Sequence, residues 1–405
     1  MKIFSNIDKR SQDRYVCILL ILVLVGSAFQ NVKVVGPLNP GHLLALCFIP
    51  FLLPKLKETK FPPAVICIFT AYILCVSLFA SFKWGLDTSI INYLFVFYII
   101  FVIVNLGRNI SFESYKKVFQ VAGILSFAIV ILNAIHYKDA ILRYFSSGYY
   151  VNHPYYPTIY GGGANLEASW PSIYGVFFMD NPYGIIYLVL SFIFASIQVS
   201  RAGIIISLIC LVIYAYKRLR ESKNPFLILF LIFVVLSLGS FYALRLGIFQ
   251  PILDRFFKNQ EDRGAAGRIG IYDNALPFLS SHPFGVGLGN AVSAVNKVAA
   301  NTVGMEPIVD DNLHNLFLQM TVETGVFGGV FYACLVAFLC FNCIFKHKFA
   351  NPFENFLLAF FALSLIQFEK IEIFPAICLG ILLSKKYYST RISIYNVILY
   401  YYSCL

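Results

Sequence analysis

Eleven segments of this 405-residue chain are apolar over most of the length that a membrane-spanning helix needs. A helix requires roughly 20 apolar residues to cross the hydrocarbon core of a bilayer, with a range of about 17 to 25. Hydrophobic residues make up 59% of the chain and charged residues 13%, so most of its surface must face lipid or other helices. We therefore predict that residues 1–405 form one integral membrane domain, an all-α polytopic protein with about 10–12 spans. The candidate spans are Val16–Val35, Leu43–Leu53, Pro62–Phe82, Ser89–Leu106, Val118–His136, Tyr183–Val199, Ala202–Tyr216, Pro225–Leu246, Gly325–Phe345, Pro352–Phe368 and Ile371–Leu383.

Basic residues form six short clusters between these segments rather than a continuous patch. Cytoplasmic loops of membrane proteins carry an excess of lysine and arginine, so we place all six clusters on the cytoplasmic side. The net charge of +11 then reflects topology and contact with anionic lipids of the bilayer, and we expect no nucleic-acid partner. The clusters are Lys2/Lys9/Arg10/Arg14, Lys55/Lys57/Lys60, Arg108/Lys116/Lys117, Lys217/Arg218/Arg220/Lys223, Lys346/Lys348 and Lys385/Lys386/Arg391.

Two long segments, residues 137–182 and 248–313, fall on the opposite side and are predicted to be periplasmic loops, the second carrying the catalytic site. The second loop has five basic against seven acidic residues and lacks the cytoplasmic bias. If both termini are cytoplasmic, the number of spans must be even, yet eleven are counted. Either Tyr183–Val199 enters the membrane without crossing it, or a further crossing lies near Ser169–Met179.

Arg201 stands between two apolar segments, in the sequence Ser200-Arg201-Ala202-Gly203. A charged side chain at membrane depth is costly, so it is a functional candidate by default. Its planar guanidinium group is always charged and matches phosphate oxygens with two parallel hydrogen bonds. Together with Arg268 in the long loop, it can hold a diphosphate and stabilise it as a leaving group. The alternative is a short turn whose arginine reaches lipid head groups.

His314 follows Asp310 and Asp311 and precedes an apolar helix. We expect one of the two aspartates to cap this helix and the histidine to occupy its first turn at the outer membrane face. Neutral histidine is the usual general base near neutral pH, and Asp311 can orient its ring. The alternative is a purely structural histidine at a helix start.

Arg268 precedes an amphipathic run, residues 269–279, which predicts a helix lying at the membrane interface. The glycine-rich residues 285–289 that follow lack a βαβ context, so we interpret them as a tight turn with close backbone approach, not as a dinucleotide-binding loop. Arg268 thus joins Arg201 and His314 as a catalytic candidate. Substrate-binding candidates in or beside this loop are Arg263, Tyr272, Asp311 and Asn315.

The first long loop is rich in aromatic residues, which form either an interfacial belt or a wall that stacks on sugar rings. The six histidines of the chain are scattered, so we predict chemistry without a metal ion and without a cofactor. A Gly-x-Ser-x-Gly nucleophile motif is absent, which favours transfer without a covalent enzyme intermediate. The aromatic residues are Tyr137, Tyr144, Tyr149, Tyr150, Tyr155, Tyr156, Tyr160, Trp170 and Tyr174.

Several of these motifs, in this order, resemble those of the O-antigen ligase/polymerase superfamily of bacterial envelope glycan assembly. The resemblance implies a GT-C-type glycosyltransferase of the bacterial inner membrane whose site faces the periplasm. It also implies an undecaprenyl-diphosphate-linked oligosaccharide as donor, with Arg201 and Arg268 on the diphosphate and His314 activating an acceptor hydroxyl. The matching motifs are Asp180-Asn181-Pro182-Tyr183, Ser200-Arg201-Ala202-Gly203, Gly267-Arg268 with His282-Pro283-Phe284-Gly285-Val286-Gly287-Leu288-Gly289, and His314-Asn315 with Glu323-Thr324-Gly325-Val326-Phe327-Gly328-Gly329.

The sequence thus predicts a polymerase of O-antigen or capsule repeat units, which transfers the glycan from undecaprenyl diphosphate to a sugar hydroxyl of another lipid-linked unit. A ligase that transfers the same glycan to lipid A-core shares the motifs and stays open. A chain-length regulator is a candidate further partner of a polymerase. A transporter or flippase is a more distant alternative; it predicts related halves, and we find no internal symmetry.

Overall fold

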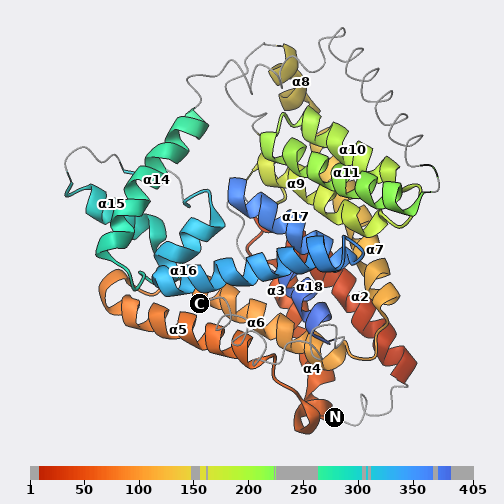
Figure 1. Cartoon of the computed structure of the whole chain (residues 1–405), viewed down its shortest axis with the longest axis horizontal. Coiled ribbons are helices and arrows are strands. Elements are labelled where there is room, and N and C mark those ends of the chain that lie inside the picture. The colour runs from red at the N-terminus through yellow and green to blue at the C-terminus, as the bar shows by residue number, and fades with distance from the viewer. Residues whose placement is uncertain are drawn as a thin grey trace.

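A bundle of helices makes up most of the protein, and α14 and α15 form a lobe to one side of it (Figure 1). The computed structural model describes residues 9–146, 156–160, 163–222, 224, 263–302, 307–308, 312–367 and 373–384. These residues contain no strand, apart from one isolated bridge between Val35 and Leu38. The elements are α2 (Lys9–Ala28), α3 (Pro40–Leu46), α4 (Ile49–Leu52), η1 (Leu53–Glu58), α5 (Ala64–Trp84), α6 (Ser89–Leu106), α7 (Phe112–His136), α8 (Lys138–Ser146), α9 (Ala164–Tyr174), η2 (Gly175–Phe178), α10 (Gly184–Ile197), α11 (Arg201–Glu221), α14 (Arg263–Ser281), α15 (Ala291–Ala299), α16 (Leu316–Phe341), η3 (Asn342–Lys346), α17 (Pro352–Ile366) and α18 (Ile373–Ser384).

Six of the described helices are long and apolar enough to cross a membrane, which confirms the predicted all-α polytopic class. Four further apolar helices are shorter, among them α17 and α18, which are buried around most of their circumference. A helix that is apolar on all sides belongs in the interior of a bundle, where neighbouring helices cover it. The predicted span Pro225–Leu246 lies outside the described residues. The six long helices cover Ser11–Ala28, Ala64–Trp84, Ser89–Leu106, Phe112–His136, Arg201–Glu221 and Leu316–Lys346.

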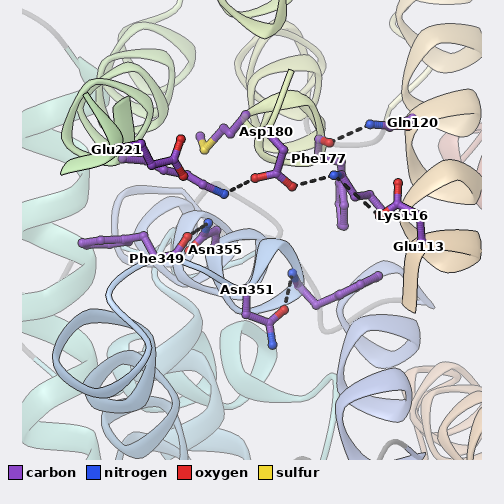
Figure 2. A network of polar contacts seen from close by, with 12 residues as sticks. Glu113, Lys116, Gln120, Phe177, Asp180, Glu221, Phe349, Asn351 and Asn355 are labelled. Carbon is purple, nitrogen blue, oxygen red and sulfur yellow. Dashed lines mark hydrogen bonds and ion pairs between the residues drawn. The ribbon is translucent and has the colours of Figure 1, made fainter. Parts of the chain in front are cut away.

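The side chains that meet at each end of the bundle identify those ends. Lys116 in the second turn of α7 and Lys217 in the last turns of α11 both bind Asp180, the residue of the Asn-Pro motif that precedes α10 (Figure 2). We call this the Lys217 end. Arg201, the first residue of α11, precedes Lys217 by 16 residues and therefore lies roughly 24 Å from it, at the opposite end of the bundle. We call that end the Arg201 end.

Residues 137–182 include a helix that crosses the bundle. At the start of α9, Asn165 accepts a hydrogen bond from the Ser200 hydroxyl at 3.0 Å, so α9 begins at the Arg201 end. The chain leaves η2 two residues before Asp180, which lies at the Lys217 end. α10 then returns to the Arg201 end before α11 starts. Of the two topological alternatives, the structure therefore supports the additional crossing near Ser169–Met179. Residues 137–182 therefore do not form a loop on one side of the bundle, because Asn165 and Asp180 lie at opposite ends. That residues 248–313 face the periplasm stays a prediction.

The aromatic residues described in this segment lie mainly in the core, so the expectation of an interfacial belt or a sugar-binding wall is wrong for them. Trp170 is fully buried, and its ring centre lies 4.5 Å from that of Phe374 and 5.8 Å from that of Tyr160. Tyr156 and Tyr174 are buried as well. Aromatic content alone does not distinguish a lipid-facing belt from rings that pack between helices. Tyr149, Tyr150, Tyr155 and the side chain of Tyr144 lie outside the described part of the chain.

The described part of the 248–313 loop has a small apolar core of its own. α14 contributes Ile271, Ala275 and Phe278, whose spacing of four and three residues places them on one helix face. Leu313 and Val322 pack into the same core from the end of the loop and from α16. The helix predicted over residues 269–279 is therefore confirmed, and its apolar face covers this core. We call this unit the α14–α15 lobe.

Asp180 joins α7, α10 and α11 at the Lys217 end. One carboxylate oxygen lies 2.5 Å from the Lys116 ammonium group, and Lys217 binds the other oxygen. Burial alone would raise the pKa of Asp180, but the two lysines outweigh burial and hold the pKa below its usual range. The stabilisation is therefore fully present above the usual aspartate pKa of about 3.9, and it is lost as the pH falls through the lowered value.

Asp180→Ala is expected to lower the free energy of unfolding by about 1–2 kcal/mol at neutral pH, because two cations lose their shared partner. The value is modest because 40% of the Asp180 side chain is exposed and solvent screens the ion pairs. Thermal unfolding of the detergent-solubilised protein measures it. Glu113→Ala is the matched control, because Glu113 lies 3.9 Å from the same Lys116 and is 64% exposed. Equal losses in both variants would contradict a bridging role for Asp180.

Candidate active site

The residues on either side of Arg201 determine its position at the start of α11. The Ser200 hydroxyl accepts a hydrogen bond from the Gly203 N–H at 3.0 Å and donates one to the Asn165 side chain at 3.0 Å. Serine is a favoured N-cap because it satisfies an amide that the helix leaves unpaired. A side chain on Gly203 would place its Cβ 2.8 Å from that of Ala168, so glycine allows α9 to approach. Arg201 itself is half-buried, and the positive end of the α11 dipole adds to its attraction for anions.

His314 lies directly before α16, in a left-handed backbone conformation with φ of +52°. Its N–H donates to the side-chain oxygen of Asn312 at 2.9 Å, in a local turn typical of asparagine. The N-cap of α16 is Asn315, whose side-chain oxygen accepts a hydrogen bond from the N–H three residues later at 3.0 Å. The expected aspartate cap is therefore wrong, and so is the expected place of His314 in the first turn, because the helix begins only after Asn315. Asp310 and Asp311 lie outside the described residues.

His314 and Arg201 lie at the same end of the bundle. The Asn315 amide donates to the carbonyl oxygen of Leu365, near the end of α17, at 3.3 Å. α17 begins at the Lys217 end, where the Phe353 ring lies 4.7 Å from that of the first residue of α7. Its other end, with Asn315 and His314, therefore lies at the Arg201 end. Both polar atoms of the Asn315 side chain bind the protein itself, and a role in binding substrate stays a prediction.

α14, whose first half contains Arg263 and Arg268, shares an apolar core with the segment before His314. Arg263 and Arg268 lie in the first half of this helix, and the structure describes the backbone at both positions. Ile271, one turn after Arg268, shares the core of the α14–α15 lobe with Leu313, the residue before the candidate histidine. Tyr272 is half-buried against that core. The fold thus places the Arg268 segment beside the histidine loop, while substrate contacts of these residues stay predictions.

The glycine-rich turn and α16 form one joint. Three main-chain hydrogen bonds of 3.1, 2.8 and 2.9 Å connect residues 283–287 with residues 322–326. α16 is interrupted here at Gly325, whose φ is +78°. A Cβ on Gly285 would lie 2.4 Å from the Gly325 nitrogen, and one on Gly325 would lie 2.6 Å from the Pro283 carbonyl oxygen. The interpretation as a tight turn with close backbone approach is confirmed, and two motifs that are distant in sequence are partners in space.

One family model matches the part of the chain that carries these features. Residues 186–333 match the O-antigen ligase family model. The matched range includes Arg201, Arg268 and His314, and it confirms the resemblance to the O-antigen ligase/polymerase superfamily. The match supports a function of the O-antigen ligase/polymerase type in a multi-pass membrane protein with lipid-linked glycan substrates. No curated protein matches the chain.

The matched residues 186–333 also contain two buried side-chain hydrogen bonds that the sequence interpretation did not predict. The side-chain oxygen of Gln319 accepts a hydrogen bond from the Leu313 N–H at 3.0 Å, and its amide donates to Glu323 at 2.5 Å. These two hydrogen bonds fix the backbone at Leu313, immediately before His314. A sequence signal was present, because the two residues are four apart in an otherwise apolar helix, where polar side chains are costly unless paired.

The groups at the Arg201 end suit an anion. Among the described residues, no three His, Cys, Asp or Glu side chains lie close enough to hold a metal ion. The described groups at this end include the guanidinium of Arg201, the imidazole of His314 and side-chain amides, and the Glu167 carboxyl group is buried there as well. Guanidinium binds phosphate oxygens strongly, and imidazole accepts or donates a proton near neutral pH.

Proposed function

We propose that this protein polymerises O-antigen or capsule repeat units at the periplasmic face of the bacterial inner membrane. The observation that supports the proposal is the placement of Arg201 and His314 at one end of the bundle, inside the region that matches the O-antigen ligase family. Lys116 and Lys217, which belong to two of the clusters of lysine and arginine, lie at the opposite end, and we propose that this end faces the cytoplasm. None of the findings supports the transporter alternative.

The proposed reaction needs one proton transfer and one leaving group. The imidazole of His314 takes the proton from a sugar hydroxyl of the acceptor while that oxygen forms a bond to the anomeric carbon of the donor glycan. The bond between this carbon and the diphosphate oxygen breaks, and undecaprenyl diphosphate leaves with the electron pair. A general base contributes about 10²–10⁴-fold to such a rate.

Arginine side chains stabilise the leaving group in this proposal. Charge accumulates on the diphosphate as its bond to the sugar breaks, and a fixed cation at that place lowers the barrier. Arg201 is held by the capped start of α11, and Arg268 lies on α14 beside the histidine loop. Arg263, Tyr272, Asp311 and Asn315 are proposed contacts to the glycan or the acceptor.

A ligase is the second candidate, because the matching family is described as O-antigen ligase. The chemistry is the same, and only the acceptor differs: lipid A-core in place of another lipid-linked unit. For the polymerase, a chain-length regulator is a proposed partner.

We expect the purified protein, supplied only with a lipid-linked repeat unit, to produce a ladder of longer lipid-linked glycans. Electrophoresis of the labelled glycan measures the ladder. No elongation, together with transfer after lipid A-core is added, would favour the ligase. Neither product from folded protein would contradict the proposed enzyme.

A further inference from the structure

We propose that Tyr156, Gln198 and Glu167 are positioning residues for Arg201, and that tight binding of the donor diphosphate needs their buried chain of hydrogen bonds. The inference rests on the proposed function, in which Arg201 contacts the diphosphate. The chain joins two turns at the Arg201 end that are far apart in sequence.

Three hydrogen bonds connect these residues, and Glu167 accepts two of them. The side-chain amide of Gln198 donates to the Tyr156 hydroxyl oxygen at 2.5 Å, and this hydroxyl donates to one oxygen of Glu167 at 3.2 Å. The other oxygen of Glu167 accepts the Ile159 N–H at 2.5 Å. Gln198 and Glu167 are both fully buried. A buried carboxylate is tolerated only where several donors surround it, so the position of each member depends on the others.

The last member of this series of hydrogen bonds, Gln198, lies three residues before Arg201. Gln198 is the C-cap of α10, and Ser200 is the N-cap of α11, so the connection between the two helices has a single intervening residue, Val199. Val199 has a φ of +49°, a conformation that a β-branched residue adopts only when its surroundings impose it. The surroundings do so through two anchors on either side of this residue, namely Gln198 on Tyr156 and Ser200 on α9.

The Tyr156 side of the chain is held independently of α10 and α11. Residues 156–160 cross the Arg201 end as a strap, where Asn133 of α7 donates to the Pro157 carbonyl at 3.0 Å. Asn31, just after α2, donates to the Thr158 carbonyl at 2.8 Å. Through this strap, the position of the first residue of α11 depends on contacts with α2, α7 and α9. A shift of about 1 Å in a group that positions substrate is enough to reduce binding or turnover strongly.

Tyr156→Phe tests the chain, because it removes the linking hydroxyl and keeps the ring, which stacks on Tyr137 at 5.5 Å. We expect the affinity of the full-length protein in nanodiscs for undecaprenyl diphosphate to fall about five- to tenfold. Gln198→Met removes the donor at the other end of the chain with little change in volume, and the same loss is expected. Tyr137→Phe is the matched control and should bind as the wild type does, because it removes a hydroxyl from the other ring of the stack.

A double-mutant cycle separates positioning from general stability. If Tyr156 acts through Arg201, then Tyr156→Phe should change the affinity less than about twofold in the Arg201→Ala background. An equal loss in both backgrounds would overturn the inference, as would wild-type affinity of Tyr156→Phe beside a weakened Arg201→Ala. If Arg201→Ala itself binds undecaprenyl diphosphate like the wild type, the proposed role of Arg201 in the function fails instead.

Discussion

His314→Ala is expected to lower the rate of glycan transfer about 10²–10⁴-fold, because the variant lacks the group that we propose takes the acceptor proton. Expression in a strain that lacks the native gene, followed by electrophoresis of the surface glycan, measures the effect as a loss of long chains. Protein abundance in the membrane is measured in parallel. Glycan of wild-type length from the variant at normal abundance would rule out His314 as the catalytic base.

A second variant separates the loss of the imidazole from a change in the backbone. His314 has a positive φ, which asparagine tolerates better than alanine does. His314→Asn should therefore keep the loop and its hydrogen bond to Asn312, yet lose transfer to the same extent. Activity that survives in the asparagine variant and is lost in the alanine variant would point to a structural histidine.

Gly325→Ala is expected to lower the free energy of unfolding by at least about 2 kcal/mol. Two costs add: alanine is strained at a φ of +78°, and its Cβ would lie 2.6 Å from main-chain atoms of Pro283 and Phe284. Because these are backbone atoms, no side-chain rotation relieves the contact. The yield of monodisperse protein and the midpoint of thermal unfolding measure the effect.

Gly270→Ala is the matched control for this variant. Gly270 lies on α14 with open space around the place of its Cβ, and its φ is not left-handed. Alanine there should be neutral or stabilise the helix by about 0.5–1 kcal/mol. Two glycine variants with equal midpoints would show that the joint between the glycine-rich turn and α16 does not contribute to stability.

Apolar length identified most helices of the bundle, but the crossing that contains α9 was only one of two alternatives for the segment near Ser169–Met179. This helix contains Glu167, Ser169 and Ser172, so its sequence lacks the continuous apolar run that predicts a membrane span. Its polar groups are satisfied by other elements instead: Ser172 shares a 2.6 Å hydrogen bond with Ser207 of α11, and Glu167 binds the strap. A helix whose polar side chains are paired inside a bundle can be buried despite low hydropathy. Such pairing is a property of the fold and is not visible along the chain.

Motifs located the candidate residues but not the contacts between them. Arg201 and His314 were recognisable because charged and titratable groups are rare beside apolar segments. The cap of α16 was not predictable, because aspartate and asparagine are about equally favoured and Asp310, Asp311, Asn312 and Asn315 all precede the helix. Likewise, no local rule pairs residues 283–287 with residues 322–326, since they meet only in the folded protein.

The joint between the glycine-rich turn and α16 consists of peptide N–H and C=O groups, and the Leu288 N–H adds a bond to the Ser77 hydroxyl of α5 at 3.1 Å. Peptide groups are the same whatever residue carries them. The attachment of the α14–α15 lobe at this joint therefore does not depend on the identity of its exposed side chains, although the exposed Lys297 also lies 5.5 Å from the ring centre of Trp84 on α5. The spacing between the Arg268 helix and α16 is thus set by the main chain.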